Sequence, residues 1–319
     1  MSTQPTSNFN IRAANGTTHQ MSSSALNLTS AILLFSTFAF GLVVNTLYLW
    51  VLWFRMIRTV NTTLFFHLIL ANLMFSIILP FVAVYFIMEP HWMFGLFLCK
   101  LINSFVSLSM YVAVFLLTLI SADRYCLVFH PHAYKKYRNP CSASITCLLF
   151  WVFAFGLTTP YLVFRQVRYE DNITICYNDY TLSGKWDKKK VKWILFSIRL
   201  FIGFVIPFSI ITFCYAKIFI KMKRECLTRS NRPYRIILFA ILSFCISWIP
   251  YHIWYGMSAE KDKFQQSVLR SLQVLSICLS CINSCFTPVV YLFIVESFKN
   301  IFKKSILAII ELVVNETFN

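Results

Sequence analysis

Seven long apolar stretches divide this chain, and they limit what it can fold into more than any other feature. A helix needs about 20 predominantly apolar residues to cross the hydrocarbon core of a bilayer. Backbone groups in lipid must be hydrogen-bonded within the protein, and a helix meets that condition by itself. The sequence therefore predicts seven membrane-spanning helices, at residues 30–54, 63–88, 96–129, 143–164, 191–222, 233–256 and 267–293.

The composition excludes a water-soluble globular protein. Hydrophobic residues make up 58% of the 319 residues, charged residues make up 13%, and the mean hydropathy is +0.66. Soluble domains carry about 25% charged residues. Membrane strands are short, alternate in polarity and must close into a barrel, which does not fit stretches of this length. We expect an all-α membrane protein, with a seven-helix bundle over residues 30–293 and no second, soluble domain.

The distribution of Lys and Arg predicts the orientation, because these residues concentrate in loops on the cytoplasmic side. Residues 1–29 contain one of them, Arg12, which places the N-terminus outside the plasma membrane and the C-terminus inside. The net charge of +17 then indicates loops that face an anionic inner leaflet, and it does not suggest a nucleic-acid partner. The loop after the fourth stretch runs against this trend. Its basic residues are Arg165, Arg168, Lys185, Lys188, Lys189 and Lys190.

The N-terminal segment and the glycan acceptor sequences support this orientation. Residues 1–29 are rich in Ser, Thr and Asn, a composition typical of a disordered segment, and no cleavable signal peptide is visible. Acceptor sequences for N-linked glycans occur at Asn15, Asn27 and Asn172. Matching sequences at Asn61 and Asn315 fall on the predicted inner side, where we expect them to be unused.

Eleven cysteines form an odd number, so at least one is free or pairs between chains. Most lie inside the apolar stretches, where a cysteine is usually a small hydrophobic residue. Cys99 and Cys176 differ, because both lie on the predicted outer side. Disulfides persist in an oxidising compartment, and we therefore expect these two residues to be bonded.

The segment LISADRYCLVFHPHAYKKYRNP, residues 119–140, places Asp123 next to Arg124 at the inner end of the third stretch. An arginine at the membrane boundary is costly unless it is paired. Such a pair is explained either by snorkelling toward water or by a switch that meets a partner protein. The motifs in the other stretches favour the switch.

Those motifs resemble landmarks of the rhodopsin-like (class A) G-protein-coupled receptors, in the order and with the spacing of that family, over nearly the whole chain. They supply Asn45 in GLVVNTLYLW; Trp92, Gly95 and Cys99 in HWMFGLFLCK; Asp123, Arg124 and Tyr125 in SADRY; Trp151 and Pro160 in LLFWVFAFGLTTP; Pro207 and Tyr215 in FVIPFSIITFCY; Phe244, Trp248 and Pro250 in FCISWIPY; and Pro288 and Tyr291 in NSCFTPVVY.

The resemblance implies a mechanism at the inner end. Asp123 holds Arg124 while the receptor is inactive, and Arg124 faces a helix of a heterotrimeric G protein once the inner ends of spans three and six separate. In the family, Trp248 and Phe244 transmit ligand contact into movement of span six. Prolines inside helices cause kinks. The further candidate switch residues are Tyr125, Tyr215, Pro207, Pro250, Pro288 and Tyr291.

The chain departs from the family at the positions that bind an inward sodium ion. Asn72 stands where span two normally has an aspartate, Thr287 replaces the Asn of the NPxxY motif, and Ala113 stands where a Ser is common. Ser109 completes this altered set. Sodium prefers hard oxygen ligands that include a formal negative charge. We therefore expect agonist binding to show little sensitivity to sodium.

A second departure concerns the start of span six. Some relatives carry an acidic residue there that holds the arginine, but this chain has Ser230 in a basic neighbourhood. Asp123 is then the only expected anionic partner of Arg124. A weaker restraint of this kind predicts raised basal signalling.

The ligand site is predicted from span five. Span three has Val106 in place of the acid that grips amine ligands, whereas Arg199 lies eight residues before Pro207, about 12 Å along a helix. Arginine binds carboxylates through paired hydrogen bonds. An internal salt bridge or a snorkelling position would also explain Arg199. The polar residues expected beside it are Ser107 and Gln273, with Trp248 below them.

An arginine at this place, together with HWMFG, resembles the chemoattractant branch, which includes receptors for formyl peptides, anaphylatoxins, chemerin and prostaglandin D2. The resemblance implies a ligand with a free carboxylate, either a peptide C-terminus or an acidic lipid. It also implies coupling to Gi-type G proteins and expression on leukocytes.

The C-terminal segment 294–319 predicts a short amphipathic helix and a cytoplasmic tail. Phe298, Ile301 and Phe302 oppose three lysines, the pattern of a helix that lies on membrane lipids. No cysteine follows Tyr291, so a palmitoyl anchor is not expected. Hydroxyl residues are sparse in the tail, and we expect weak arrestin recruitment through it. They are Ser297, Ser305 and Thr317, and the three lysines are Lys299, Lys303 and Lys304.

Three other functions are alternatives to a signalling receptor. A secondary transporter usually shows internal repeats and broken helices, and neither is visible. An enzyme or metalloprotein needs grouped catalytic or ligating residues, but the six histidines are scattered, so no enzymatic activity, cofactor or metal is expected. A decoy receptor that binds ligand without signalling is the closer alternative, because Asn72 and Thr287 depart from the signalling pattern while Asp123 and Arg124 keep it. The histidines are His19, His67, His91, His130, His132 and His252.

Overall fold

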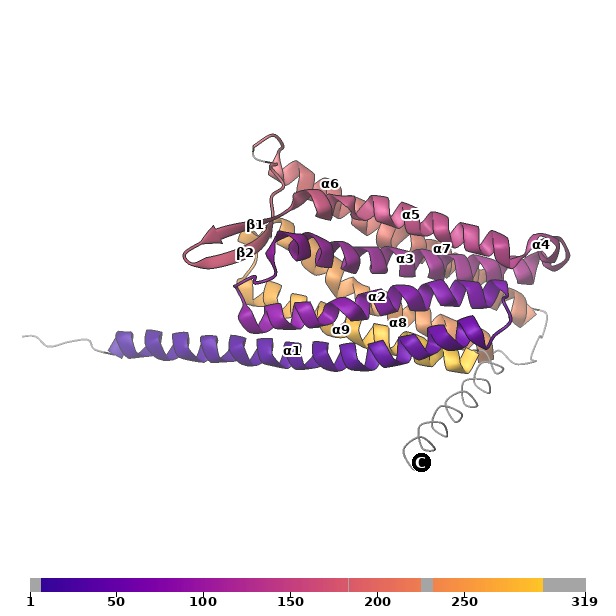
Figure 1. The fold of residues 1–319 in the computed structure, drawn as a ribbon, viewed down its shortest axis with the longest axis horizontal. Helices are drawn as coiled ribbons and strands as arrows, with labels where there is room; N and C mark the ends of the chain where they lie inside the picture. Colours follow the sequence, from indigo (N-terminus) through magenta and orange to yellow (C-terminus); the bar gives the residue numbers. More distant parts are fainter. Residues whose placement is uncertain (1–6, 183, 225–231, 295–319) are drawn as a thin grey trace, which may run out of the picture.

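The computed structural model describes residues 7–182, 184–224 and 232–294, and in them long helices lie side by side in one bundle (Figure 1). The elements are α1 (Ser7–Phe54), α2 (Val60–Met88), α3 (Gly95–Phe129), α4 (Pro131–Tyr137), α5 (Pro140–Phe164), β1 (Arg165–Glu170), β2 (Ile173–Asn178), α6 (Lys188–Leu200), the π-helix η1 (Phe201–Val205), α7 (Ile206–Arg224), α8 (Arg232–Ala259), the 3₁₀ helix η2 (Lys261–Lys263) and α9 (Gln266–Ile294).

The seven predicted spans correspond to helices of the bundle. Over the residues that are described, six helical stretches are long and apolar enough to cross a membrane, and α6, η1 and α7 form one of them, Lys188–Arg224. The predicted span 233–256 lies within α8. Outside α1, each predicted boundary lies within three residues of the observed one, because turn residues and charges mark where each apolar stretch ends.

The N-terminus differs from its prediction. Helix α1 begins at Ser7, so residues 7–29 are helical instead of disordered. No proline occurs between Ser7 and Phe54, and nothing in that sequence forces the helix to stop. The part of α1 that is long and apolar enough to cross a membrane includes Ala25–Phe54, and this range contains the predicted span 30–54.

Local hydrogen bonds set several helix starts. Thr59 caps α2 in a reciprocal capping box with Thr62, and the Asn139 side chain accepts the backbone N–H of Ser142 at the start of α5. Asp187 caps α6 by accepting two backbone N–H groups, and these bonds lower the pKa of its carboxyl. Such caps satisfy amide groups that have no partner within the helix.

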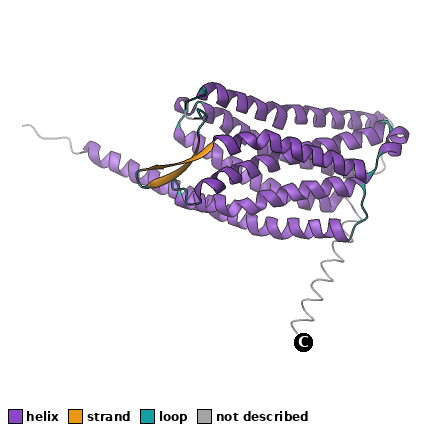
Figure 2. Cartoon of the chain, turned by 45° about the horizontal axis from the view of Figure 1, so that its top comes forward, coloured by secondary structure: helices purple, strands orange, loops and turns teal. Residues whose placement is uncertain are grey.

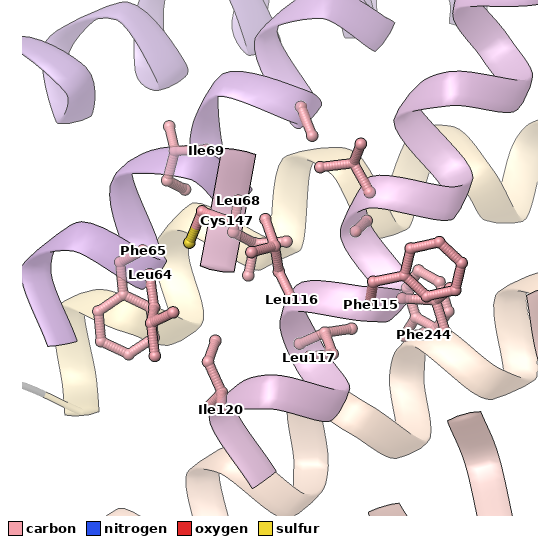
Figure 3. Close-up of a cluster of buried hydrophobic side chains, with 14 of the residues drawn as sticks. Leu64, Phe65, Leu68, Ile69, Phe115, Leu116, Leu117, Ile120, Cys147 and Phe244 are labelled. Atoms are coloured by element: carbon pink, nitrogen blue, oxygen red, sulfur yellow. The ribbon is translucent and has the colours of Figure 1, made fainter. Parts of the chain in front are cut away.

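Helix α3 lies at the centre and packs against α2, α5 and α7. Buried side chains from four helices meet there, among them Leu68, Leu116, Cys147 and Phe244 (Figure 3). Val152 of α5, by contrast, is 71% exposed. Lipid tails are as apolar as leucine, so close packing and not hydrophobic burial drives association of such helices. The exposed apolar face of α5 is therefore a lipid-facing surface.

An antiparallel hairpin covers one end of the bundle, on the side from which α1 projects (Figures 1 and 2). We call this the hairpin end and the opposite one, which carries α4, the Arg124 end. Strands β1 and β2 flank a two-residue turn, and Cys176 pairs with Val167 in the register. The sequence prediction did not include these strands.

The predicted disulfide is present. Cys99 at the start of α3 and Cys176 of β2 are bonded, with a sequence separation of 77 residues and a Cα–Cα distance of 5.8 Å. Trp92 holds the same region, since its backbone N–H donates to Thr174 and its indole N–H donates to Gly95. The hairpin is therefore fastened to α3. Eight further cysteines of the described residues are free, and they include Cys141.

We expect Cys176→Ser to lower the thermal midpoint of the membrane-embedded protein. A bond that closes a loop of this length restricts the unfolded chain by about 4.5 kcal/mol in the chain-entropy treatment. Thermal unfolding followed by thiol-reactive fluorescence measures the change. Cys141→Ser, which removes an exposed free thiol, is the control, and equal midpoints for the two variants would contradict a structural role for the bond.

Candidate functional site

The predicted ligand residue Arg199 is buried inside the hairpin half of the bundle. It lies in the last turn of α6, its exposed fraction is 2%, and its Nη2 donates to Ser107 Oγ at 2.5 Å. Ser107, which we expected among the ligand-site residues, therefore contacts Arg199 directly. A side chain this deeply buried does not snorkel toward water.

Four tyrosine rings surround the Arg199 guanidinium. Its central carbon lies 5.8 Å from the ring centroid of Tyr111, 4.8 Å from Tyr161, 5.3 Å from Tyr251 and 5.0 Å from Tyr255. These residues come from α3, α5 and α8. Cation–π contacts stabilise a desolvated guanidinium, but they leave its positive charge uncompensated.

No carboxylate among the described residues forms an ion pair with Arg199; the ion pairs found there join other residues. The internal salt bridge that could have explained Arg199 is therefore not found in the described part of the chain. Buried charges in proteins are normally paired. The site thus presents a buried positive charge that no carboxylate of the described residues neutralises.

A cavity of about 120 Å³ adjoins this guanidinium. Tyr111, Tyr161, Tyr180 and Tyr255 line it together with Arg199. Small-molecule sites are usually about 300–1,000 Å³. The cavity therefore has room for a terminal carboxylate and a small group, and a larger ligand must extend beyond it.

A second guanidinium lies nearby and was not predicted as a site residue. Arg165 at the start of β1 donates from Nη2 to Asn103 Oδ1 at 2.7 Å, and burial lowers its pKa. Tyr161, Tyr180 and Tyr255 act on it electrostatically, as two of them act on Arg199. Both arginines thus make the environment of the tyrosines positive.

The π-helix η1 and Gly203 position Arg199. The backbone N–H of Ile206 donates to Phe201 in the wider π pattern, directly before Pro207, and π-helical turns often occur at functional sites. A Cβ atom on Gly203 would lie 2.9 Å from Tyr111 Cε1. The absence of a side chain at Gly203 therefore lets this segment approach α3 closely.

We expect Gly203→Ala to destabilise the bundle by about 1–3 kcal/mol, the usual cost of overpacking. Gly156→Ala is the matched control, because a Cβ on Gly156 meets nothing within 4 Å. Thermal unfolding of both variants in nanodiscs measures the difference. A Gly203 variant as stable as the Gly156 variant would show that the close approach is not required.

Gln273 lies in a different cluster from the one predicted. Its side-chain oxygen accepts a hydrogen bond from Arg270, which forms an ion pair with Glu89 and also donates to Asn27. The Arg270 guanidinium lies 4.8 Å from the ring centroid of Phe86. This cluster links α1, α2 and α9 at the hairpin end, and no contact joins Gln273 to Arg199 in the described residues.

The predicted transmission residues are neighbours within α8. Trp248 and Phe244 are buried, and their ring centroids lie 5.9 Å apart. Trp248 also contacts Tyr251 at 5.4 Å, which is one of the rings around Arg199. Pro250 lies within α8. A continuous series of rings therefore extends from the Arg199 site toward the middle of the bundle.

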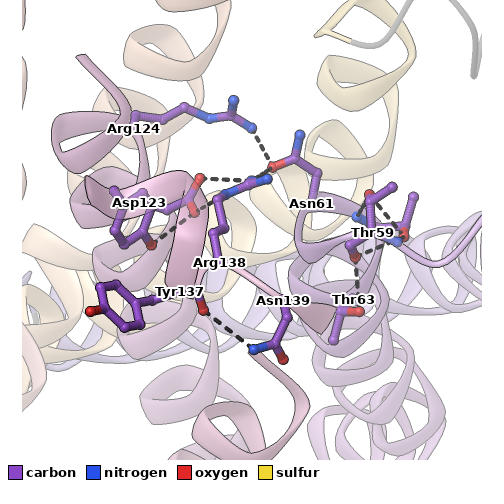
Figure 4. Close-up of polar contacts among 10 residues, drawn as sticks. Thr59, Asn61, Thr63, Asp123, Arg124, Tyr137, Arg138 and Asn139 are labelled. Atoms are coloured by element: carbon purple, nitrogen blue, oxygen red, sulfur yellow. Dashed lines mark hydrogen bonds and ion pairs between the residues drawn. The ribbon is translucent and has the colours of Figure 1, made fainter. Parts of the chain in front are cut away.

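At the Arg124 end, the prediction that Asp123 holds Arg124 is wrong (Figure 4). Asp123 is 2% exposed, and its carboxylate accepts two hydrogen bonds from Arg138, one from Nε at 2.7 Å and one from Nη2 at 3.1 Å. The Tyr134 hydroxyl donates to the same carboxylate. Helix α4 follows α3 immediately and brings both partners back to Asp123, a fold that the sequence pattern did not indicate.

Arg124 instead donates from Nη2 to Asn61 Oδ1 at 2.8 Å, and Arg138 donates to the same oxygen at 2.7 Å (Figure 4). Arg124 is therefore held by a neutral amide and not by a carboxylate. Burial, followed by the negative charge of Asp123, raises the pKa of Tyr134 to about 12. Tyr134 thus remains a hydrogen-bond donor throughout the physiological range.

The aromatic switch residues also lie near α7. The ring of Tyr125 stacks on Phe129 with centroids 4.5 Å apart and lies 5.9 Å from Phe213 of α7. Tyr215 is buried. Other predicted positions lie outside the described part of the chain. They are the side chains of Pro288 and Tyr291, the residue Ser230, and residues 295–319 of the predicted amphipathic helix and tail.

The altered sodium positions are buried and polar. Asn72, Ser109 and Ala113 have exposed fractions below 8%. The Nδ2 atom of Asn72 and the Oγ atom of Ser109 have no hydrogen-bond partner among the described residues. The Thr287 side chain is outside the description. The described part of this site thus lacks a formal negative charge.

The predicted glycan acceptors have different environments. Asn172 lies exposed in the hairpin turn, where its side-chain oxygen accepts the Tyr169 hydroxyl. Asn27 Nδ2, the atom that a glycan would modify, donates to Glu89 at 3.4 Å. The side chain of Asn15 is outside the description.

Sequence reasoning missed Arg138, Tyr134 and Asn61 at the Arg124 end. Tyr134 and Arg138 could have been considered, because both lie in the polar segment that directly follows Asp123. The tyrosines around Arg199 had no such signal, since they are ordinary aromatic residues spread over three helices.

Comparisons with known proteins address the family of this chain. The family described as "7 transmembrane receptor (rhodopsin family)" matches residues 44–291. "Probable G-protein coupled receptor 33" of Mus musculus is 42% identical over 294 residues, which cover 90% of this chain and 85% of that protein. The same receptor of Pan paniscus is 40% identical, with 88% and 86% covered.

Chemoattractant-type receptors are also similar. "Chemerin-like receptor 1" of Mus musculus is 34% identical, with 81% of this chain and 73% of that protein covered. "C3a anaphylatoxin chemotactic receptor" of Oncorhynchus mykiss is 35% identical, with 86% and 76% covered. The chain is a multi-pass membrane protein that belongs to the rhodopsin family of G-protein-coupled receptors, in its chemoattractant branch.

Proposed function

We propose that this receptor binds an extracellular ligand with a free carboxylate at Arg199 and in response activates a Gi-type heterotrimeric G protein at Arg124. The observation that carries the proposal is the buried Arg199 guanidinium, which has a hydroxyl and four rings around it but no carboxylate partner among the described residues. A ligand carboxylate would supply the missing negative charge through charge-assisted hydrogen bonds.

The hairpin end faces the outside in this proposal. The disulfide between Cys99 and Cys176 lies there, and disulfides persist in oxidising compartments. The exposed Asn172 lies in the hairpin turn, where glycosyltransferases could reach it. The Arg124 end carries the inner loops, so the G protein meets Arg124 from the cytoplasm. Gi coupling is supported by the similarity to a receptor named as chemotactic.

A paired ligand screen tests this function. Synthetic peptides and fatty acids with free carboxylates are compared with their C-terminal amides and methyl esters on cells that express the chain. We expect acids to activate G protein where the neutral counterparts do not, and pertussis toxin to abolish the response. Binding of acids without any G-protein activation would instead establish the decoy receptor.

Sodium should have little effect on this receptor. Because Asn72 places a neutral amide where a carboxylate would bind the ion, we expect agonist affinity to be the same in sodium chloride and in N-methylglucamine chloride. Asn72→Asp restores the carboxylate and should introduce a dependence on sodium. A strong sodium effect in the unmodified receptor that Asn72→Ala removes would refute this expectation.

A further inference from the structure

A cluster of lysines stands at the hairpin end, beside the Arg199 site. It consists of Lys188, Lys189 and Lys192 of α6 and Lys261 and Lys263 of η2, and we call it the lysine cluster. Except for the half-buried Lys192, its members are exposed. Lys188 and Lys261 act electrostatically on Lys192, and α6 packs against α8 next to η2. The five lysines are thus neighbours in space.

The carboxylates within this cluster do not compensate its charge. Glu260 is shared between Lys189, at 3.3 Å, and Lys263, at 2.5 Å, and these bonds lower the pKa of Glu260. Asp262 and Asp187 are the other nearby acids, so three carboxylates face five lysines. The lysine cluster therefore retains net positive charge on the side of the membrane where basic residues are normally depleted.

Lys192 is the half-buried member of the cluster and the one that adjoins the Arg199 site, and Asp262 acts on it electrostatically without forming an ion pair. The Nζ atom of Lys192 lies 3.5 Å from the carbonyl oxygen of Ala259 and 5.8 Å from the ring centroid of Tyr180, and no carboxylate of the described residues forms an ion pair with it. Tyr180 also lines the cavity beside Arg199. Lys192 is thus connected through one ring to the predicted carboxylate site.

The spacing between the two cations specifies a ligand. Lys192 and Arg199 are seven residues apart on one helix, which is about 10 Å along its axis and nearly the same face. An extended peptide advances about 3.3 Å per residue, so three residues span this distance. The cavity holds only a terminal group, and the remainder of the ligand must extend past Tyr180 toward Lys192.

We propose that the ligand is an acidic peptide whose C-terminal carboxylate binds Arg199 and whose Asp or Glu side chain, three residues before the C-terminal one, binds Lys192 and the lysine cluster. This deepens the proposed carboxylate function and rests on it. The lysine cluster favours such peptides over fatty acids, whose hydrocarbon tail carries no charge, because only the peptide has a second anion at the required distance.

Fluorescent octapeptide pools test the proposal on the full-length receptor in nanodiscs. One pool has Glu fixed three residues before the C-terminal position, and matched pools have Ser or Lys there; each pool is made as free acid and as amide. We expect the Glu acid pool to bind about fivefold more tightly than the Ser acid pool, because one partly exposed ion pair changes affinity by about this factor. The difference should shrink as salt rises.

Variants separate this proposal from the one it rests on. Lys192→Gln should remove the preference for Glu while the preference for acid over amide remains, and Arg199→Gln should remove the preference for acid. Lys185→Gln changes an exposed lysine that precedes α6 and lies outside the cluster, and it should alter neither preference.

Two results would overturn the acidic-peptide proposal. One is equal binding of the Glu and Ser acid pools, with the acid preference intact. The other is retention of heparin by the lysine cluster without any preference for Glu. Loss of the acid preference in the unmodified receptor would instead overturn the proposed function.

Discussion

Arg199→Ala should sharply lower the potency of a carboxylate ligand while the receptor still reaches the cell surface. Truncating one partner of a buried charged pair costs at least about 2 kcal/mol, which corresponds to a loss of potency of about thirtyfold. The Ser107 hydroxyl that now accepts from Arg199 cannot replace the lost charge. A dose–response curve for G-protein activation, with surface expression measured in the same cells, gives the result.

Arg199→Lys is the matched variant for this prediction. Lysine keeps the positive charge but loses the planar fork and its stacking between tyrosine rings. We expect a potency between those of the unmodified receptor and Arg199→Ala. If Arg199→Ala leaves the dose–response curve unchanged, Arg199 is not part of the ligand site.

Arg138→Ala should lower basal G-protein activation. In the structure Arg138 occupies the Asp123 carboxylate with two hydrogen bonds, so Asp123 does not restrain Arg124. Removing the Arg138 side chain leaves a buried carboxylate without its main partner, and the adjacent Arg124 is the nearest cation able to take its place. A restraint of about 1 kcal/mol corresponds to a fivefold decrease in basal nucleotide exchange.

Arg138→Lys and Tyr134→Phe are the controls for this second prediction. Lysine still pairs with Asp123 and should leave basal activity near that of the unmodified receptor. Phenylalanine removes one hydrogen bond to Asp123 but keeps Arg138 in place, and it should have a smaller effect. A rise in basal exchange for Arg138→Ala, at equal surface expression, would show that Arg138 itself restrains the receptor.

The sequence predicted the helices well because their limits are local. Each apolar stretch ends at charged or turn-forming residues, so Met88, Phe129 and Phe164 were placed as helix ends without knowledge of the packing. The disulfide could also be predicted from the sequence, since Cys99 and Cys176 lie on the predicted outer side, whereas most other cysteines lie inside the apolar stretches. The start of α1 at Ser7 was not, because polar residues allow both helix and disorder.

The hairpin was missed although a local signal exists. Val167, Tyr169, Ile173 and Ile175 alternate with polar residues around the turn Asp171–Asn172, and both turn residues have positive φ. Two-residue turns of this kind join antiparallel strands. The pattern is short and lies between two much longer apolar stretches, so the segment was interpreted only as a loop that joins two helices.

The polar networks depend on how helices pack, which one sequence does not reveal. Arg124 and Asp123 are adjacent in the chain, but successive residues of a helix point in different directions. The turn into α4 delivers Arg138 to Asp123, and Asn61 of α2 reaches Arg124. The rings around Arg199 likewise come from three helices, so their convergence follows only from the bundle.

The most direct test of the central claim, that a carboxylate at Arg199 causes Arg124 to engage a G protein, is guanine-nucleotide exchange on purified Gi in nanodiscs. With a carboxylate agonist, the unmodified receptor should accelerate exchange by at least about fivefold, the lower range of allosteric coupling. Arg124→Ala should bind the agonist but give no acceleration. Equal acceleration by Arg124→Ala, or none by the unmodified receptor when agonist is bound, would contradict the claim.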